Sequence, residues 1–394
     1  MPNVLTINGG SSSIRFAIFE ASRPPRRLLQ GIMERIGRDD ASLTIDHGAG
    51  QAPLHIKVPI KDRGKAIDVL MDSLESQPLF KTLAGVGHRV VHGMRHTHPE
   101  RVTAELLNEL KGIIPFDPEH LPREIELIEA LQRRDSRLPQ AVCFDTAFHR
   151  SMPRVATQLP IPRRYEARGI QRYGFHGLSY TFLMQELARL GDPAAARGRV
   201  ILAHLGSGAS LAAVRDGRCI DTSMGFTPTA GLVMGTRSGD LDPGLMSYLA
   251  LTDAMTAMQF QALVNHESGL LGVSETSADV RDLLDRETSD PRAAEALALF
   301  CYQAKKWIGS FAAALGGVDT LVFAGGIGEN AAPVRERICA GLDFLGIDID
   351  EAANSRHAPR ISTETGSVTV RVIRTDEESV IAALSIAVLE LEPT

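Results

Sequence analysis

A turn of small residues near the start of the chain separates two apolar runs. The segment Asn8–Ser13 holds two glycines and three serines between the apolar stretches 4–7 and 14–19. Such a turn exposes backbone N–H groups with almost no side-chain bulk, which suits the close approach of an anionic phosphate. The pattern predicts a β-hairpin with a phosphate-binding tip. A plain tight turn is the alternative, because glycine and serine are common in turns.

The same order of strand, turn and strand returns later in the chain. The segment 205–210 reads Leu-Gly-Ser-Gly-Ala-Ser and lies between the apolar runs 201–203 and 211–214. Ser210 follows Ser13 by half of the 394-residue chain. The repeat favours two related lobes, each of which offers one phosphate loop to a cleft between them.

A third glycine-rich segment, Gly325–Asn330, follows a predicted strand and precedes a predicted helix. Backbone amides at such a turn can bind phosphate and let a nucleoside lie flat against the chain. Gly326, Gly328 and Ala331 also satisfy the dinucleotide pattern Gly-x-Gly-x-x-Gly/Ala, with Asp348 about 20 residues further on. An NAD-dependent dehydrogenase is therefore the alternative of another class. It is disfavoured because too little chain follows to complete a dinucleotide domain.

Four charged or titratable side chains stand where chemistry is expected. Arg89 lies in the predicted strand 85–91, and its planar guanidinium suits a carboxylate or phosphoryl group; an internal salt bridge is the alternative. Asp145 follows a predicted strand, where α/β proteins bind ligands, although it can equally cap a helix. His176 lies between glycines and Arg237 in a glycine-bounded loop. Both side chains can donate hydrogen bonds to phosphoryl oxygens. The alternatives are a histidine of the core for His176 and an ordinary loop for Arg237.

Composition narrows the function classes. The net charge of −6 argues against a general nucleic-acid binder. No apolar run reaches the roughly 18 to 20 residues that span a bilayer, and the N-terminus has no secretory signal pattern, so no membrane partner and a cytoplasmic location are expected. Four histidines between His88 and His98 fall partly on a predicted strand and lack metalloprotease spacing, so zinc is disfavoured.

Short β-rich runs alternate with amphipathic helical stretches, which predicts an α/β protein with helix-covered sheets. The length favours two domains. We expect an N-terminal lobe over 1–150, a C-terminal lobe over 151–377, and a last segment, 378–394, that packs back on the first lobe. Strands are expected at 4–7, 14–19, 85–91, 141–144, 200–203, 211–214, 321–324 and 368–373. Helices are expected at 64–70, 103–111, 122–132, 178–190, 291–315, 333–342 and 378–391.

Several longer strings, in order over essentially the whole chain, resemble the acetate kinase family of the actin, sugar-kinase and Hsp70 superfamily. The resemblance implies two related actin-like (ribonuclease H-like) lobes around a nucleotide-binding cleft. It implies reversible, Mg²⁺-dependent transfer of a phosphoryl group from ATP to acetate, giving ADP and acetyl phosphate, with Mn²⁺ as a possible substitute and a homodimer as the assembly. Propionate and butyrate kinases share the architecture and stay open as alternatives. The strings are 8–13, 88–93, 144–149, 172–177, 204–210, 221–225, 231–243, 268–273, 325–330 and 375–378.

The resemblance also implies roles for individual residues. Asp145 corresponds to the active-site acid, His176 and Arg237 to transition-state stabilisers, and Asn8 with Glu377 to a magnesium-associated pair. The carboxylate-binding arginine is Arg89, and the apolar pocket for the acyl methyl consists of Val91, Phe175 and Pro228. The nucleotide-binding positions are Arg15, His204, Leu205, Gly206, Ser207, Gly208, Asp279, Val280, Arg281, Gly326, Ile327, Gly328, Glu329 and Asn330.

The chain departs from the family pattern at a few positions. Arg15 stands in place of a usual lysine, Ser207 in place of asparagine and Tyr180 in place of histidine. The stretch 115–121 aligns poorly with the family's Ala-Pro-Leu-His-Asn-Pro. Because acetate is already an anion at neutral pH, the reaction needs no general base. The hypothesis for Asp145 is therefore that it orients Arg89 or Arg237, or holds a magnesium-bound water.

Overall fold

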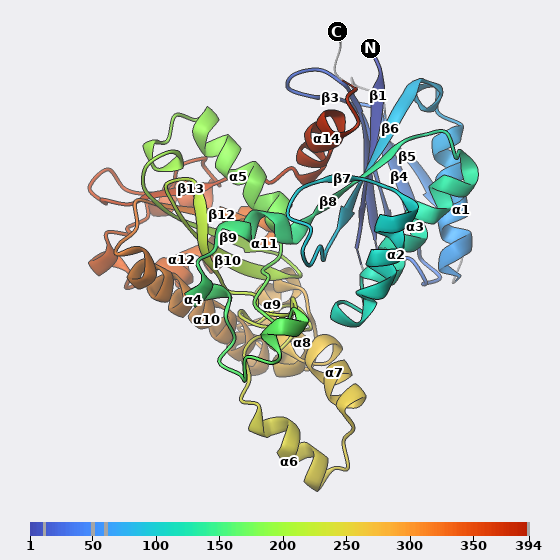
Figure 1. Cartoon of the computed structure of the whole chain (residues 1–394). Helices are drawn as coiled ribbons and strands as arrows, with labels where there is room; N and C mark the ends of the chain where they lie inside the picture. Colours follow the sequence, from blue (N-terminus) through green and yellow to red (C-terminus); the bar gives the residue numbers. More distant parts are fainter. Residues whose placement is uncertain (11–12, 49–51, 59–61, 392–394) are drawn as a thin grey trace. The chain divides into compact units, whose positions relative to one another are not determined.

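The computed structural model describes residues 1–10, 13–48, 52–58 and 62–391 (Figure 1). Ser11 and Ser12 of the first small-residue turn lie outside the described residues. The chain divides into two units. Unit 1 consists of Met1–Ala147 with Asp376–Thr394, and unit 2 consists of Phe148–Thr375. Within the described ranges, no helix has the length and apolar character needed to cross a membrane.

Unit 1 is built on an eight-stranded sheet with the order β5-β4-β3-β2-β1-β6-β8-β7. Strands β1 to β5 pair as antiparallel neighbours, whereas β6 lies parallel to both β1 and β8. The strands are β1 (Asn3–Gly9), β2 (Ile14–Glu20), β3 (Arg26–Glu34), β4 (Ser42–Asp46), β5 (Leu54–Lys57), β6 (Leu83–Val90), β7 (Glu100–Arg101) and β8 (Gln140–Phe144).

Helices cover both faces of this sheet (Figure 1). On one face, Ile67 and Leu70 of α1 and Leu127 of α3 join the apolar core formed with Leu5 and Ile7 of β1. Because side chains alternate along a strand, β1 sends its other residues to the opposite face, where α14 lies. The helices of unit 1 are α1 (Arg63–Glu75), α2 (Ala104–Gly112), α3 (Leu121–Arg134) and α14 (Glu377–Val388).

Two glycines of β6 let α14 lie close to the sheet. A Cβ atom on Gly87 would come within 2.1 Å of Ser385 Oγ, and one on Gly85 within 2.6 Å of Leu389 Cδ1. Val4 of β1 packs against Ile386 of α14 on the same face. The last helix of the chain is therefore part of the core of the first unit.

Unit 2 is built on a five-stranded sheet with the order β11-β10-β9-β12-β13. Strands β11, β10 and β9 are antiparallel, and β12 lies parallel to both β9 and β13. This repeats the order β3-β2-β1-β6-β8 of unit 1, with the same directions. The strands are β9 (Arg199–Leu205), β10 (Ala209–Arg215), β11 (Arg218–Thr222), β12 (Thr320–Ala324) and β13 (Thr369–Val372).

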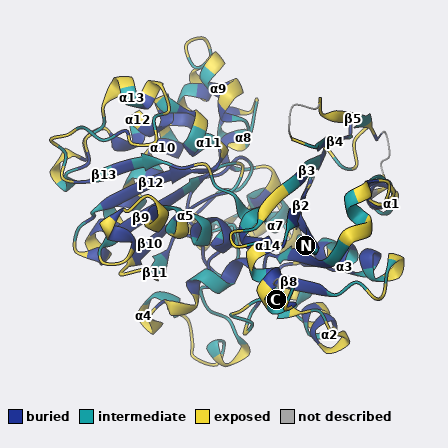
Figure 2. Cartoon of the chain, turned by 90° about the horizontal axis from the view of Figure 1, so that it is seen from above, coloured by how far each residue is buried: buried dark blue, intermediate teal, exposed yellow. Residues whose placement is uncertain are grey.

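Helix α5 covers one face of the second sheet, with Tyr180 and Leu183 packed against Val200 and Leu202 of β9. Helix α10 packs against β9 and β10. The central strands of both sheets are largely buried, as their dark colour in Figure 2 shows. The helices of unit 2 are α4 (Arg154–Thr157), α5 (Gly177–Arg189), α6 (Gly244–Thr252), α7 (Ala257–His266), α8 (Gly269–Ser274), α9 (Val280–Arg286), α10 (Pro291–Leu315), α11 (Gly325–Asn330), α12 (Ala332–Cys339) and α13 (Glu351–Ser355).

Every predicted strand and helix is present, with boundaries that shift by a few residues. The sequence did not predict the strands β3, β7 and β11 or the helices α4, α6 to α9, α11 and α13. The strands β4 and β5 pair antiparallel within the region 35–57, for which the sequence indicates a polar hairpin. Glu377, counted above with the second lobe, lies in unit 1 as the first residue of α14. All four cysteines are buried free thiols.

Candidate active site

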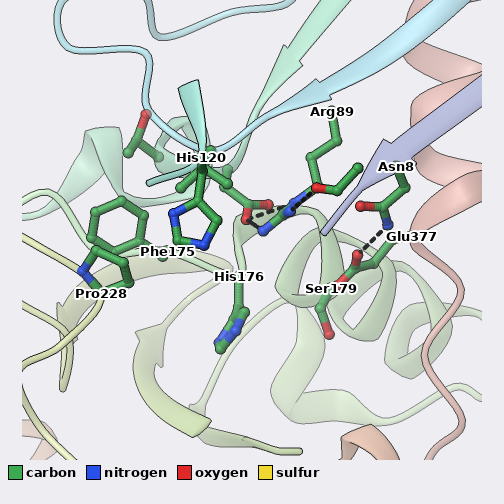
Figure 3. Close-up of polar contacts among 12 residues, drawn as sticks. Asn8, Arg89, His120, Phe175, His176, Ser179, Pro228 and Glu377 are labelled. Atoms are coloured by element: carbon green, nitrogen blue, oxygen red, sulfur yellow. Dashed lines mark hydrogen bonds and ion pairs between the residues drawn. The ribbon is translucent and has the colours of Figure 1, made fainter. Parts of the chain in front are cut away.

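Arg89, labelled in Figure 3, meets Asp145 at the ends of two parallel strands. Arg89 lies in β6, and Asp145 directly follows β8, which pairs with β6. The Nε and Nη2 atoms of Arg89 both donate to Asp145 Oδ2, at 3.0 and 2.6 Å, and Nη1 donates to the Gly9 carbonyl at 3.3 Å. The arginine side chain is 14% exposed and the aspartate 1%. One carboxylate thus fixes the guanidinium.

The charge of Arg89 is secure although the group is buried. Burial disfavours the cation, but the carboxylates of Asp145, Glu377 and Glu124 outweigh it and raise the pKa of Arg89 above its usual value. A planar cation held from one side in this way can offer its remaining N–H groups to a carboxylate or a phosphate.

Asn8 and Glu377 form a second contact in unit 1 (Figure 3). The amide Nδ2 of Asn8 donates to Glu377 Oε2 at 2.8 Å and to Glu378 Oε1 at 3.4 Å. Burial, with the Asp145 carboxylate, raises the pKa of Glu377, and burial, with Glu377 nearby, raises that of Glu378. Arg15, the cross-strand neighbour of Asn8, opposes both shifts.

This donor set fits a magnesium ion. The amide oxygen of Asn8 and the carboxylate of Glu377 are the oxygen ligands that Mg²⁺ prefers. Within the described ranges, no three His, Cys, Asp or Glu residues lie close enough to hold a metal by themselves. That is expected for Mg²⁺, which takes one or two protein carboxylates and completes its shell with water and substrate phosphates.

A buried polar cluster that the sequence did not predict lies next to the backbone of Val91. Val91 N–H donates to Glu124 Oε2 at 3.0 Å, and Glu124 Oε1 has no hydrogen-bond partner among the described residues. Burial raises the pKa of Glu124 to about 8. Nearby, Asp117 Oδ1 accepts from His120 Nδ1 at 2.8 Å, within the stretch that departs from the family pattern. Glu124 in sequence looks like any charged residue of an amphipathic helix.

In unit 2, His176 and Arg237 lie beside the second small-residue turn. A Cβ atom on Gly208 would be 3.3 Å from His176 Nε2 and 3.7 Å from Arg237 Nη1. The His176 ring stacks on His204, with 4.3 Å between ring centroids. Arg237 Nη1 donates to the Pro228 carbonyl at 3.0 Å. The structure therefore brings both predicted transition-state stabilisers to one turn.

The predicted nucleotide segments also converge in unit 2. The turn between β9 and β10 is closed by Gly206 N–H, which donates to the Gly208 carbonyl at 3.0 Å. Gly235 N–H donates to the Ser207 carbonyl at 3.1 Å, and its Cβ position lies 3.2 Å from the Ala278 carbonyl, next to the start of α9. A Cβ on Gly206 would be 3.9 Å from Gly326 N, at the start of α11.

Asp279, Val280 and Arg281 form the start of α9. The Asp279 carboxylate caps this helix by accepting from Arg281 N–H at 2.9 Å, and it pairs with the Arg281 guanidinium at 2.6 Å. Val280 is buried, so these two polar side chains are the ones presented at the surface.

The third glycine-rich segment is held from several sides. Glu329 Oε1 accepts from Gly325 N–H at 3.0 Å and from Thr375 N–H at 3.1 Å. Asn330 Nδ2 donates to the Gly326 carbonyl at 2.9 Å. Gly325 needs its left-handed φ of +76°, since a Cβ there would lie 2.6 Å from the Leu205 carbonyl. A Cβ on Gly326, by contrast, would meet no atom within 4 Å.

A buried arginine supports the same segment and was not predicted. Arg335 of α12 is fully buried and donates from Nη1 to the carbonyls of Gly328 and Glu329, at 2.8 and 3.0 Å, and from Nε to Asn354 Oδ1 at 2.8 Å. Burial lowers its pKa to about 10. In sequence, an arginine in a short helix carries no mark of this role.

The predicted acyl-pocket residues come from both units. Val91 belongs to unit 1, and Phe175 and Pro228 belong to unit 2. Val91 and Phe175 are buried, and the Phe175 carbonyl accepts from His149 Nε2 at 2.9 Å.

The sheet of unit 2 argues against the dehydrogenase alternative. A dinucleotide fold needs a mostly parallel sheet built from two mononucleotide-binding halves. Here two of the four strand pairings, β11 with β10 and β10 with β9, are antiparallel, and only β13 follows β12 in the sheet. Asp348 precedes β13 by some twenty residues and accepts from the Thr363 hydroxyl at 3.0 Å.

The chain is similar in sequence and in fold to known proteins. Residues 3–383 match the acetokinase family. A propionate kinase of Citrobacter rodentium (strain ICC168) is 42% identical, over 96% of this chain and 95% of the relative. An acetate kinase of Rhodopseudomonas palustris (strain ATCC BAA-98 / CGA009) is 42% identical, over 96% of each. The crystal structure of Porphyromonas gingivalis acetate kinase is 33% identical with a TM-score of 0.87, covering 99% of this chain and 100% of that one.

These matches confirm the predicted α/β fold class, the family resemblance and the expectation of a kinase. The chain belongs to the acetokinase family.

Proposed function

We propose that the protein transfers a phosphoryl group from ATP to acetate, giving ADP and acetyl phosphate, and that it also runs in reverse. The observation that carries this proposal is the Arg89 guanidinium, fixed by Asp145 through two hydrogen bonds at 3.0 and 2.6 Å. A cation held in this way, and still partly exposed, is suited to a small carboxylate. Family relatives that act on acetate and on propionate support the substrate class.

In this proposal Asp145 acts on Arg89 and not on a substrate proton. Acetate carries no proton at neutral pH because carboxylic acids titrate near 4. Asp145 Oδ2 accepts hydrogen bonds from two nitrogens of Arg89, so the main role proposed for Asp145 is to orient that cation. Of the hypotheses for Asp145, the one that involves Arg89 has direct geometric support.

The phosphoryl group presents the larger electrostatic problem, since an anion must attack another anionic group. His176 and Arg237 lie beside Gly208 and can donate to phosphoryl oxygens in the transition state, which is worth about 2.7 to 4 kcal/mol for each such donor. Asn8 and Glu377 are the residues that would hold Mg²⁺. Bound Mg²⁺ supplies positive charge that neutralises phosphate oxygens.

The nucleotide is proposed to bind along the segments 204–208, 279–281 and 326–330. Their support is the convergence of the β9–β10 turn with the starts of α9 and α11, together with the open position beside Gly326. Mg²⁺ dependence, a homodimer and a cytoplasmic location stay predictions of the family resemblance.

The direct test is a hydroxylamine trap for acyl phosphate with ATP, Mg²⁺ and a series of acids from formate to butyrate. We expect the highest kcat/KM with acetate and measurable turnover of propionate, because one methylene changes binding by only about 1 to 3 kcal/mol. A higher kcat/KM for propionate would instead identify a propionate kinase. Absence of acyl phosphate from every acid would overturn the proposal.

Asp145→Asn tests the role of the acid. Asparagine retains one acceptor oxygen but loses the charge beside Arg89, so we expect a lower kcat/KM whose pH profile keeps the shape seen in the natural protein. If the variant loses a pH-dependent limb and added external bases restore turnover, Asp145 is a general base after all.

A further inference from the structure

Two buried hydroxyl groups connect to His176 within unit 2. The Oη atom of Tyr180 lies 2.5 Å from Ser210 Oγ, and Ser210 Oγ lies 2.9 Å from His176 Nδ1. Tyr180 and Ser210 are both fully buried. Tyr180 is one helical turn beyond His176 at the start of α5, and Ser210 lies on β10. We call these three residues the 176–180–210 relay.

The backbone of His176 shows that its position is enforced. Its φ is +59° and its ψ is +24°, in the left-handed region that residues other than glycine rarely adopt. Such conformations cost free energy and persist where surrounding contacts determine them. Here the ring is held by Ser210 at Nδ1 and by stacking on His204, and the site of a Cβ on Gly208 is 3.3 Å from Nε2. The second ring nitrogen therefore faces the small-residue turn.

The directions of the two hydrogen bonds set which nitrogen of His176 carries the hydrogen, and the donor strengths of the two hydroxyl groups favour one assignment. Ser210 has one hydroxyl proton and two neighbours, Tyr180 Oη and His176 Nδ1. A phenol is a much stronger donor than an aliphatic alcohol, so the Tyr180 proton points to Ser210 Oγ. The Ser210 proton then points to His176 Nδ1, which accepts it. A neutral imidazole that accepts at Nδ1 carries its own proton at Nε2.

We propose that Tyr180 is a positioning residue that acts through Ser210 to fix His176 as the Nε2–H tautomer, so that Nε2 donates a hydrogen bond to the transferring phosphoryl group. No proton is transferred in this role: His176 donates the same hydrogen bond to the phosphoryl oxygen before and after transfer. The inference rests on the proposed function, which makes His176 a transition-state donor. It also gives a task to the tyrosine that departs from the family pattern.

Tyr180→Phe removes the hydroxyl and keeps the aromatic ring packed against Phe148 and His149. We expect kcat to fall about tenfold, the kinetic value of one hydrogen bond of about 1.4 kcal/mol, while both KM values change less than twofold. Tyr173→Phe is the matched control: Tyr173 is also buried, and its hydroxyl donates to the Gly169 carbonyl at 2.6 Å, outside the relay. It should leave kcat unchanged. Equal losses in the two variants would overturn the proposal.

Ser210→Ala provides a second variant, because it removes the atom through which Tyr180 acts. Its kcat should fall at least as far as that of Tyr180→Phe. The double variant should cost no more than Ser210→Ala alone, since residues that act as one unit are not additive. Additive losses would mean that Tyr180 acts by another route, which contradicts the relay.

The tautomer can be read without turnover by ¹⁵N NMR of histidine side chains, with the His176 signals assigned by comparison with His176→Asn. We expect a protonated Nε2 and an unprotonated Nδ1 in the natural protein, and a mixture of tautomers in Tyr180→Phe. Protonated Nδ1 in the natural protein would overturn the relay even if acyl phosphate forms. Conversely, the expected tautomer with no acyl phosphate from any acid would overturn the proposed function alone.

Discussion

The two units share one strand order but equip the ends of their strands differently. In unit 1 the ends of β1, β6 and β8 carry Asn8, Arg89 and Asp145, and α14 adds Glu377. In unit 2 the ends of β9 and β12 lead into the glycine turns 206–208 and 325–328. The strand ends of unit 1 thus present mainly charged side chains, whereas those of unit 2 present mainly backbone N–H groups that no side chain covers.

This difference matches the two substrates that we propose. A short carboxylate offers one charge and few atoms, so a fixed guanidinium gives it most of its recognition. A nucleotide offers a chain of phosphates and a flat base, for which exposed N–H groups and missing side chains are the better partners. Removal of charged groups from unit 1 should therefore weaken the use of acetate, and addition of side-chain atoms to unit 2 should weaken nucleotide binding.

Removal of Arg89 should have the largest effect. Arg89→Ala should lower kcat/KM for acetate by roughly 100- to 1000-fold, because it removes the cation that binds the carboxylate and leaves Asp145 buried without its partner, with the KM for ATP changed little. Arg89→Lys keeps the charge but loses the planar fork and should recover only part of the loss. Steady-state kinetics with each substrate varied would measure this.

A control for Arg89 comes from an exposed arginine of the same unit. Arg26 pairs with Glu20 and is 65% exposed, so Arg26→Ala should leave both kinetic constants unchanged. Urea unfolding of each variant would show whether loss of the partner of Asp145 unfolds the protein. An Arg89→Ala enzyme that stays folded and keeps its acetate kcat/KM would contradict the comparison.

Glu124 should give the next effect, on stability. The pKa of Glu124 is about 8 in the folded protein and near 4.5 in the unfolded chain. The contribution of its neutral carboxyl group to the free energy of unfolding is therefore fully present below pH 4.5 and is lost as pH rises through about 8. Arg89, Asp117 and Asp145 are the charges that act on it. Glu124→Gln should remove this pH dependence and gain on the order of 4 kcal/mol relative to the natural protein between pH 5 and 8.5.

Urea unfolding midpoints across that pH range would measure the difference. Glu129→Gln is the matched control, because Glu129 lies on the same helix in a partly exposed pair with Lys111. It should leave the pH dependence as it is. Parallel pH curves for the natural protein and Glu124→Gln would show that Glu124 is ionised in the fold.

Addition of one methyl group to the backbone of unit 2 should have the smallest effect, and it tests the other half of the comparison. Gly326→Ala places a Cβ where no protein atom lies within 4 Å, so stability should be kept. The KM for ATP should rise about tenfold, a cost of about 1.4 kcal/mol, if the nucleotide occupies that space. Gly309→Ala on α10, which is equally open, should change no kinetic constant. An unchanged KM in Gly326→Ala would place the nucleotide elsewhere.

Much of the fold could be predicted because buried strands and long amphipathic helices leave a periodic pattern. The strand before Asn8, the strand with Arg89 and the helix 291–315 are examples. The outer strands β4 and β5 carry a weaker pattern, and the region 35–57 indicates only a polar hairpin, because half or more of the residues in these strands are not buried. Helix α6 was missed because none of its residues is buried and no apolar face repeats.

The candidate site was predicted residue by residue, but its contacts were not. Arg89 and Asp145 are 56 positions apart, and only the parallel pairing of β6 with β8 brings them together. Glu124 and Arg335 escaped notice because a charged residue in a helix is ordinarily solvated. Their burial depends on long-range packing, which no local pattern encodes. The roles of the site residues stay predictions until the variants above are measured.

The pairing of α14 with Gly85 and Gly87 has a consequence for how the chain is made. Residues 1–147 of unit 1 leave the ribosome before unit 2, yet one face of their sheet stays uncovered until residues 376–391 emerge. At 5 to 20 residues per second, the intervening chain takes roughly ten to fifty seconds to synthesise. Unit 2, a continuous segment, can complete its core first, while the larger part of unit 1 still has an apolar sheet face exposed to water.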